Sequence, residues 1–195
     1  NVDLAHSSAQ ARVNVIGGPG SQAGVVVRHT AGGYYYGQIR NTAGGARAEI
    51  YRVVGNNVTQ LASVPIGAST GYIRLEAVGN SLKLFFGPTP GSMTQVAFAY
   101  DSRWQSGAQG VRASAGMFID DFIADEIALV DPAQPPSSLP FQDTFSTPIN
   151  GDQLSRNWMY QAGNFQVLPG NILQGNTAGL HIATIFSDLP DGTIS

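Results

Sequence analysis

The 195-residue sequence contains no cysteine, and this absence excludes disulfide frameworks, thiolate metal sites and cysteine nucleophiles together. Charge is also scarce, because Asp, Glu, Lys and Arg make up only 12% of the residues. Lys83 is the single lysine. The net charge of −3 and the scattered basic residues give no sign of a nucleic-acid partner. No apolar run approaches the length that spans a membrane, so no membrane span is expected.

Glycine is plentiful, with 24 residues, and it separates short alternating segments. Alternation is clearest at residues 72–77, where Ile73, Leu75 and Ala77 share one face, and turn residues 78–81 join this segment to 82–86. Further strands are predicted at 13–16, 23–29, 34–40, 47–54, 58–64, 95–100, 117–130, 141–145, 158–161, 164–168 and 180–186. About a dozen short strands without helices predict an all-β sandwich of two packed antiparallel sheets.

One linker interrupts this pattern. Residues 131–140 contain four of the eleven prolines, and a Pro/Ser-rich run of this kind stays extended and usually separates modules. Residues 1–130 read like the end of a β-domain, whereas residues 141–195 read like the beginning of one. The chain is therefore expected to start and stop within a module. It begins at Asn1 without methionine or signal peptide, which indicates a processed chain or a fragment.

The order of these segments resembles a known family. Four segments follow one another as in the concanavalin A-like, laminin-G-type jelly roll: AGVVVRHTAGGYYYGQIR, ARAEIYRVVGNNVTQLASV, GYIRLEAVGNSLKLFF and IDDFIADEIA. The segment that resembles the opening of such a module, FQDTFSTPINGDQLSRNWMYQAGNFQV, lies after the linker. The resemblance implies an antiparallel jelly-roll β-sandwich in permuted order. Residues 1–130 would supply its later strands and residues 141–195 its opening strands.

Two arrangements explain the permuted order. Either the domain is a circular permutant that closes on itself, or the chain is one period of a tandem array and residues 141–195 belong to the next copy. We favour the array because a proline-rich spacer is a natural boundary between copies, although the sequence contains no internal duplicate. In an array, each piece alone would expose sheet edges and half a core, and pairing with a neighbouring copy removes both.

The sequence therefore favours a non-enzymatic structural module that assembles head to tail into a fibre or surface array by strand complementation. Its partners would be other copies of itself. The alternative is a monomeric carbohydrate-binding, lectin-like module of a secreted enzyme or adhesin. A secreted or cell-surface location is expected, because Asn, Gln, Ser and Thr are plentiful and lysine is nearly absent. No small-molecule cofactor is implied.

Catalytic groups do not come together in the sequence. A retaining glucanase of this fold needs two carboxylates about 5 Å apart, but Glu49, Glu76 and Glu126 fall on separate predicted strands. The three histidines are isolated and no Gly-x-Ser-x-Gly elbow accompanies them. We therefore expect no enzymatic activity.

Carboxylates gather around residue 120. Alternation would place Asp121 and Asp125 on one strand face and Asp120 and Glu126 on the other. The family resemblance implies that Asp143 lies on the adjacent first strand. Asp120, Asp121 and Asp143 are therefore predicted ligands of a structural calcium ion, which takes about six to eight oxygens. The competing explanation is a set of exposed edge carboxylates that discourage sheet-to-sheet association.

Aromatic residues give a second candidate site. Trp104 lies next to Arg103 in a Gly/Ser/Gln-rich loop that is expected to be exposed, and Tyr34 and Tyr36 share one face of a predicted strand. Sugar-binding modules use exposed rings flanked by polar groups, so these four residues are predicted to contact a glycan or a protein partner. Loop packing is the third explanation for Trp104. Trp158 matches the family's early core tryptophan and is expected to pack.

One modification site is also predicted. Asn57-Val58-Thr59 is a glycosylation sequon. It lies at the tip of a predicted hairpin, where Asn57 would be accessible as the acceptor.

Overall fold

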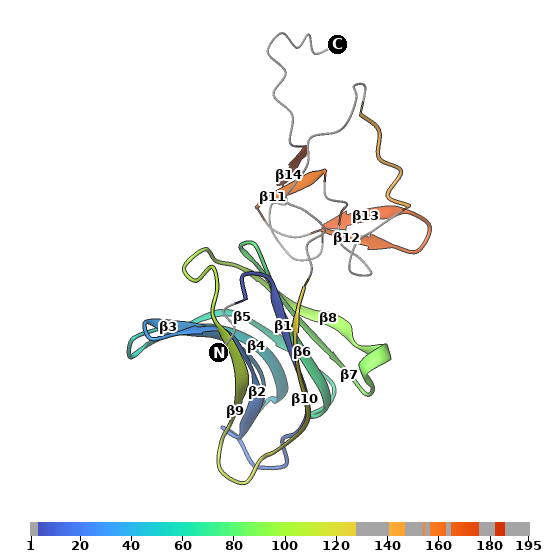
Figure 1. Cartoon of the computed structure of the whole chain (residues 1–195). Helices are drawn as coiled ribbons and strands as arrows, with labels where there is room; N and C mark the ends of the chain where they lie inside the picture. The colour runs from blue at the N-terminus through green and yellow to red at the C-terminus, as the bar shows by residue number, and fades with distance from the viewer. Residues whose placement is uncertain are drawn as a thin grey trace. The chain divides into compact units, whose positions relative to one another are not determined.

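Strands dominate the structure. The computed structural model describes residues 4–127, 141–146, 154, 157–162, 165–175 and 182–185, and the chain divides into two compact units, Asn1–Ala128 (unit 1) and Leu129–Ser195 (unit 2). Within the described residues the one helical element is the 3-10 turn η1, Pro90–Ser92, so none of these residues forms a helix able to cross a membrane. The predicted all-β sandwich is confirmed (Figure 1).

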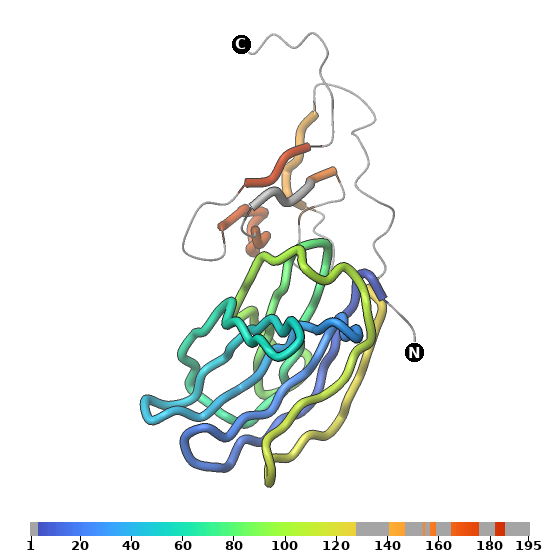
Figure 2. Tube along the Cα trace, turned by 90° about the vertical axis from the view of Figure 1, so that its left-hand side faces the viewer, coloured from blue at the N-terminus to red at the C-terminus, as the bar shows by residue number. Residues whose placement is uncertain are grey.

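Unit 1 consists of two five-stranded antiparallel sheets. The first sheet has the strand order β10-β1-β6-β7-β8 and the second has the order β5-β4-β3-β2-β9. Their bounds are β1 (Ser7–Asn14), β2 (Gln22–Thr30), β3 (Gly33–Thr42), β4 (Gly45–Val54), β5 (Asn57–Pro65), β6 (Thr70–Val78), β7 (Ser81–Gly87), β8 (Thr94–Tyr100), β9 (Ala108–Ala113) and β10 (Phe118–Glu126). Figure 2 traces them in blue to yellow, with β10 running beside β1.

Alternate residues of both sheets point inward and form the core of unit 1. Ile73, Leu75 and Ala77 on β6 are fully buried, as the alternation predicted. On β7, Leu84 is fully buried and lies against Gly37 of the other sheet, where an added Cβ would come within 2.5 Å of the Leu84 Cδ1 atom. Glycine at position 37 therefore lets the two sheets approach each other. Each large aliphatic side chain buried here contributes about 1.5–3 kcal/mol.

Strand β1 differs from its prediction. It spans Ser7–Asn14 rather than 13–16, and Ile16 is 62% exposed. The inward positions of β1 are held by small residues, Ala9 and Ala11, whose weak hydrophobic signal hid the alternation. Strand β9 was not predicted for a similar reason, because glycine and alanine occupy half of it.

Strand β10 forms the edge of the first sheet, where it pairs with β1 alone. Eight of its nine residues are exposed. The ladder between β1 and β10 shifts register between Gln10 and Arg12, and Asp121 has a φ of 52°. The simple alternation predicted for the acidic residues of this strand is therefore wrong, because a bulge interrupts it. The prediction extended the strand to residue 130, and residues 128–130 lie outside the described residues.

A bulge in β2 turns Arg28 into the sandwich. Arg28 has a φ of 52° and is fully buried. Its guanidinium donates to the carbonyl oxygens of Ala5 (2.6 and 3.1 Å), Gly79 (2.7 Å) and Trp104 (2.9 Å). Burial lowers the pKa of Arg28 to about 10. Because a buried cation is tolerated only when its donors are satisfied, this side chain fixes three connecting segments at one point.

Unit 2 is organised differently. Its described strands form two separate two-stranded sheets, β11 (Trp158–Ala162) with β14 (Ile182–Ile185) and β12 (Phe165–Leu168) with β13 (Ile172–Gly175). Leu154 and Val167 are its buried apolar residues in the described part of the chain. The strand predicted at 141–145 is not one, since residues 141–146 form no strand.

Trp158 packs within unit 2, as the sequence predicted. Its ring centroid lies 5.8 Å from that of Phe141 and 6.2 Å from that of Phe145. The indole Nε1 donates a hydrogen bond of 2.7 Å to Asp143 Oδ2. The aromatic cluster and this hydrogen bond hold residues 141–145 against the start of β11.

Candidate functional site

The outer face of the second sheet gathers aromatic, amide and arginine side chains. Inward positions such as Val25, Tyr35 and Ile50 belong to the core, so the alternate positions of the same strands lie on the opposite face. We call this surface the Tyr/Arg face. It comprises His29, Tyr34, Tyr36, Gln38, Arg40, Arg47, Glu49, Tyr51 and Arg112.

Strand register aligns these residues into rows across the sheet. One row runs from β9 to β5 as Arg112, Gly24, Gln38, Glu49 and Ser63. The neighbouring row is Gly110, Val26, Tyr36, Tyr51 and Gln60. Because glycine occupies position 24, no side chain stands between Arg112 and Gln38 in the first row.

The aromatic rings of this face form a ladder. Centroid distances are 5.2 Å between His29 and Tyr34, 6.0 Å between Tyr34 and Tyr36, and 4.9 Å between Tyr36 and Tyr51. The Arg112 guanidinium lies 4.1 Å above the Tyr36 ring centroid. In the sheet β4 lies on one side of β3, and β9 lies beyond β2 on the other side, so Tyr51 and Arg112 approach the Tyr36 ring from opposite sides. Tyr34 and Tyr36 share one face as predicted, but Tyr36 has no open ring face on which a sugar could stack.

Glu49 is the one carboxylate among the described residues of this sheet, and it organises the polar row. It is buried and accepts hydrogen bonds from Gln38 Nε2 (2.9 Å), the Tyr51 hydroxyl (2.9 Å) and Ser63 Oγ (3.2 Å). Arg47 Nε donates to the same Ser63 Oγ over 2.7 Å. Burial, and then the hydrogen bond to Glu49, raise the pKa of Tyr51 to about 12. The network therefore fixes the orientation of each polar side chain.

Three polar atoms on the face have no hydrogen-bond partner: Gln38 Oε1, Arg40 Nε and Arg112 Nη1. Gln38 is only 2% exposed. Its amide orientation is set by the bond from Nε2 to Glu49, so the oxygen faces away from that carboxylate. A buried acceptor without a donor costs about 1–3 kcal/mol. One acceptor and two donors are thus oriented but covered, so a ligand would reach them only when the side chains above them move aside.

Trp104 does not form the exposed platform that its loop composition predicted. It is half-buried and packs against the core, with Nε1 donating to Val53 O (3.1 Å) and its backbone N–H donating to the Tyr35 hydroxyl (2.9 Å). Gly33 leaves room for the indole, since an added Cβ there would lie 2.8 Å from the Trp104 ring. Arg103 is exposed, and its guanidinium lies 5.3 Å from the indole centroid. Of the three explanations given for Trp104, these contacts support loop packing.

The predicted calcium ligands have other partners. Asp120 Oδ1 accepts from the Asp121 backbone N–H (2.8 Å), and Asp121 Oδ2 accepts from the Tyr72 hydroxyl (2.7 Å). Asp143 Oδ1 accepts from the Phe145 backbone N–H (2.8 Å). No group of three or more His, Cys, Asp or Glu side chains suited to a metal ion occurs in the part of the chain that the structure describes. Asp120 and Asp121 belong to unit 1 and Asp143 to unit 2, and the calcium site predicted from these three residues stays a prediction.

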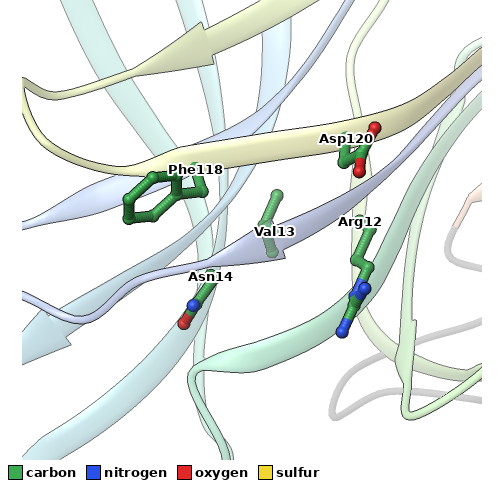
Figure 3. A pocket seen from close by; sticks show the side chains of 5 residues that line it. All are labelled: Arg12, Val13, Asn14, Phe118 and Asp120. Atoms are coloured by element: carbon green, nitrogen blue, oxygen red, sulfur yellow. The ribbon is translucent and has the colours of Figure 1, made fainter.

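A small pocket opens on the first sheet at the ladder between β1 and β10 (Figure 3). Its lining residues are Arg12, Val13, Asn14, Phe118 and Asp120. The charged groups of Arg12 and Asp120 point in different directions in Figure 3. The pocket belongs to the other sheet and is separate from the Tyr/Arg face, so it adds no residue to that face.

The remaining candidates are isolated. Asn57 is exposed and begins β5 directly after the hairpin turn, which is the accessible position that the sequence predicted. His6 Nδ1 accepts from the Gly79 backbone N–H (3.1 Å), and burial lowers its pKa. His29 is exposed beside the aromatic ladder, and His181 lies outside the described residues.

Comparison with known proteins shows the fold. A scan against protein-family models finds no match, and a search of curated proteins finds none either. Among solved structures, carbohydrate-binding module CBM66 from Bacillus subtilis matches with a TM-score of 0.52 and 15% identity, over 65% of this chain and 78% of that one. A functionally unknown protein from Saccharomyces cerevisiae matches with a TM-score of 0.52 and 16% identity, over 64% and 72%.

A variant of a GH43 protein from Bacillus licheniformis matches with a TM-score of 0.50 and 14% identity, over 61% of this chain but only 27% of that protein. Identities at this level show shared architecture and nothing finer. The chain thus contains a concanavalin A-like jelly-roll β-sandwich, and the architecture implied by the sequence resemblance is confirmed. The permuted order of its strands stays a prediction.

Proposed function

We propose that this chain carries a non-catalytic, extracellular module that binds carbohydrate through the Tyr/Arg face. The observation that carries the proposal is Gln38, an amide 2% exposed whose oxygen lacks a donor. It lies in one row with Arg112, which also has an unpaired nitrogen. The fold supports the proposal, because a carbohydrate-binding module shares it.

Binding would depend on hydrogen bonds rather than on ring stacking. Both faces of Tyr36 are covered, so the ladder presents ring edges and hydroxyl groups. Sugar hydroxyls both donate and accept hydrogen bonds, and thus match a surface with unpaired atoms of both kinds. The Glu49 network holds these groups in place before a ligand arrives, which lowers the entropic cost of binding.

The shortage of carboxylates on the second sheet favours binding without hydrolysis. A retaining glycosidase uses two carboxylates about 5 Å apart. Among the described residues of this sheet Glu49 is the one carboxylate, and it already accepts three hydrogen bonds. We therefore expect a ligand to be retained unchanged on this face.

Glycan binding by the full chain tests the proposal. Gln38→Leu keeps the side-chain volume and removes the unpaired oxygen together with the hydrogen bond to Glu49, so it should weaken binding about tenfold. Gln10→Leu, on the first sheet, is the matched control and should bind normally. Circular dichroism would verify that both variants fold. A wild-type chain that binds no member of a broad panel of neutral and acidic glycans would refute the proposal.

A second candidate function is the head-to-tail assembly that the sequence favoured, and the edge strand β10 supports it. Phe118, Phe122 and Ile123 are 61%, 44% and 46% exposed on this unpaired edge. An exposed apolar edge is a template for another strand. We propose residues 141–195 of a second copy as the occupant.

One feature of unit 2 favours that occupant. Its described strands stop at two-stranded sheets, which are marginally stable without further pairing. Unit 2 contains one basic and five acidic residues and β10 is itself acidic, so the contact would rest on strand pairing and apolar burial rather than on charge.

Particle size tests this second candidate. Ile123→Lys places a charge on the β10 edge and should convert assemblies into monomers in light scattering and negative-stain microscopy. Val64→Lys places the same charge on the edge strand β5 and should leave assembly intact. A wild-type chain that is monomeric at high concentration would exclude the assembly function and leave the glycan proposal unaffected.

A further inference from the structure

We propose that the ligand of the Tyr/Arg face is an acidic saccharide whose sugar residues carry a carboxylate. The inference rests on the proposed glycan-binding function and narrows it to one class of ligand. Three independent features of the face point to this class: its charge, the kinds of unpaired atom on it, and the way one arginine is held.

Charge is divided unequally between the two sheets of unit 1. The strands of the second sheet contain five arginines and one glutamate, whereas those of the first sheet contain three basic and five acidic residues. Arg28 is turned inward and Arg52 pairs with Asp101 at 2.5 Å. The other three arginines, Arg40, Arg47 and Arg112, lie on the Tyr/Arg face. They outnumber the single carboxylate of Glu49, in a chain whose overall charge is −3.

The unpaired atoms require two kinds of hydrogen-bond partner, an acceptor and a donor. Arg40 Nε and Arg112 Nη1 are donors and need an acceptor, for which a carboxylate is the strongest match. Gln38 Oε1 is an acceptor and needs a donor such as a hydroxyl. A fully ionised sulfate offers acceptors only and leaves Gln38 unpaired, whereas a neutral sugar leaves the arginines without a counter-charge. A uronic acid residue supplies the hydroxyl and the carboxylate together.

The position of Arg112 also fits recognition of a carboxylate. Its guanidinium is stacked 4.1 Å from the Tyr36 ring centroid, an arrangement that holds the planar group in one orientation. Gly24 places no side chain between Arg112 and Gln38, so both can reach the same sugar ring. An oriented guanidinium can bind both oxygens of a carboxylate, which a lysine in its place could not do.

The test uses the full chain and a panel of uronate polymers, namely polygalacturonate, alginate and hyaluronate, each beside its carboxyl-reduced form. The reduced polymer keeps the backbone and the hydroxyls but loses the charge. Dextran sulfate serves as an anion without carboxylate, and all titrations are run at one ionic strength near physiological. We expect at least one uronate polymer to bind about tenfold or more tightly than its reduced form and than dextran sulfate.

Substitutions of single arginines test whether the ligand binds at the Tyr/Arg face. Arg112→Gln and Arg40→Gln should each weaken uronate binding on the order of tenfold, and Arg112→Lys should weaken it to an intermediate degree. Arg12→Gln removes the same charge from the first sheet and should change binding less than about twofold. Thermal unfolding of each variant would show that the fold is retained.

Other outcomes overturn the inference in distinguishable ways. Equal binding to the uronate and reduced polymers refutes the acidic ligand while leaving the proposed function intact. Equal binding to dextran sulfate refutes carboxylate recognition and leaves only general attraction to anions. If no polymer binds, the inference fails, and the broad panel of neutral and acidic glycans decides separately whether the proposed function fails. If Arg112→Gln changes the particle size of the free chain, the face is a protein contact and the inference fails.

Discussion

Unit 1 and unit 2 both form antiparallel strands, but the described strands of the two units build sheets of different size. In unit 1, ten strands pair into two five-stranded sheets that share one core, so each sheet buries its inner face. In unit 2 the described strands form only two-stranded sheets, and Leu154 and Val167 are the buried apolar residues among those described. A sandwich is stable when both inner faces are covered, whereas an isolated hairpin is marginal. Among the described residues, the two units therefore differ in strand pairing beyond the hairpin.

The largest expected effect would test how far the stability of unit 1 depends on the buried guanidinium of Arg28. Arg28→Met would remove the guanidinium and leave the carbonyl oxygens of Ala5, Gly79 and Trp104 without a donor. We expect unit 1 to lose about 3–5 kcal/mol in urea unfolding. Arg103→Met, at an exposed position, is the control and should change little. An unaltered midpoint for Arg28→Met would mean that the three segments are fixed by other contacts.

A substitution that leaves a cavity in the core should destabilise unit 1 more than unit 2. Leu84→Ala in unit 1 should cost about 3 kcal/mol, because the fully buried side chain leaves a cavity between the sheets. Val167→Ala in unit 2 should cost about 1 kcal/mol. Hydrogen exchange of backbone amides in each unit measures both effects. A comparable loss for the two variants would break the comparison, since it would indicate an equally cooperative core in unit 2.

Alkaline pH should act on unit 1 through Tyr51. Its pKa is raised from 10.0 to about 12, so the folded state holds the phenolic proton more tightly than the unfolded state. The resulting stability is fully present below pH 10.0 and is lost as the pH rises through about 12, with a total of about 2 kcal/mol.

Tyr51→Phe should therefore lose less stability than the wild type between pH 10.0 and about 12. Unfolding by urea at a series of pH values measures the two slopes. The contribution of Arg28, whose pKa is lowered, is present in both proteins and cancels in their difference. Parallel slopes would show that the Tyr51 proton is not held by the Glu49 network.

The smallest effect is expected in unit 2. Trp158→Phe keeps an aromatic ring beside Phe141 and Phe145 but removes the hydrogen bond to Asp143. We expect a loss of about 1 kcal/mol, confined to the amides of β11 and β14. Protection of β6 and β7 should not change. A loss of protection in both units would show that they unfold together.

Much of the fold could be predicted from alternation and turn residues. The three hairpins of unit 1 appear where Gly, Asn or Thr separate strongly alternating segments, as between residues 30 and 33. The errors occur where the signal is weak or broken. Small inward residues hid the start of β1, and a bulge at Asp121 places Asp120 on the same face as Asp125, although alternation expected opposite faces.

The candidate site could be predicted only in part. Tyr34 and Tyr36 follow from alternation, but Gln38, Glu49 and Arg112 were not selected, because their meeting depends on register across strands far apart in sequence. Pairing of equivalent positions on neighbouring strands was the signal that could have placed Gln38 beside Glu49. The half-burial of Trp104 could not be read from a polar loop, since it depends on the space left by Gly33 in another hairpin.

The two tryptophans are divided between the units, one in each. The Trp104 indole donates to a backbone carbonyl beside the end of β4, whereas the Trp158 indole donates to a carboxylate. The tryptophan fluorescence of the chain is therefore the sum of two emissions, one from each unit. In a Trp158→Phe background all indole emission comes from Trp104, whose partner Val53 packs with Tyr36 and Tyr51. The chain thus contains its own optical probe for titrations at the Tyr/Arg face, and no label has to be attached.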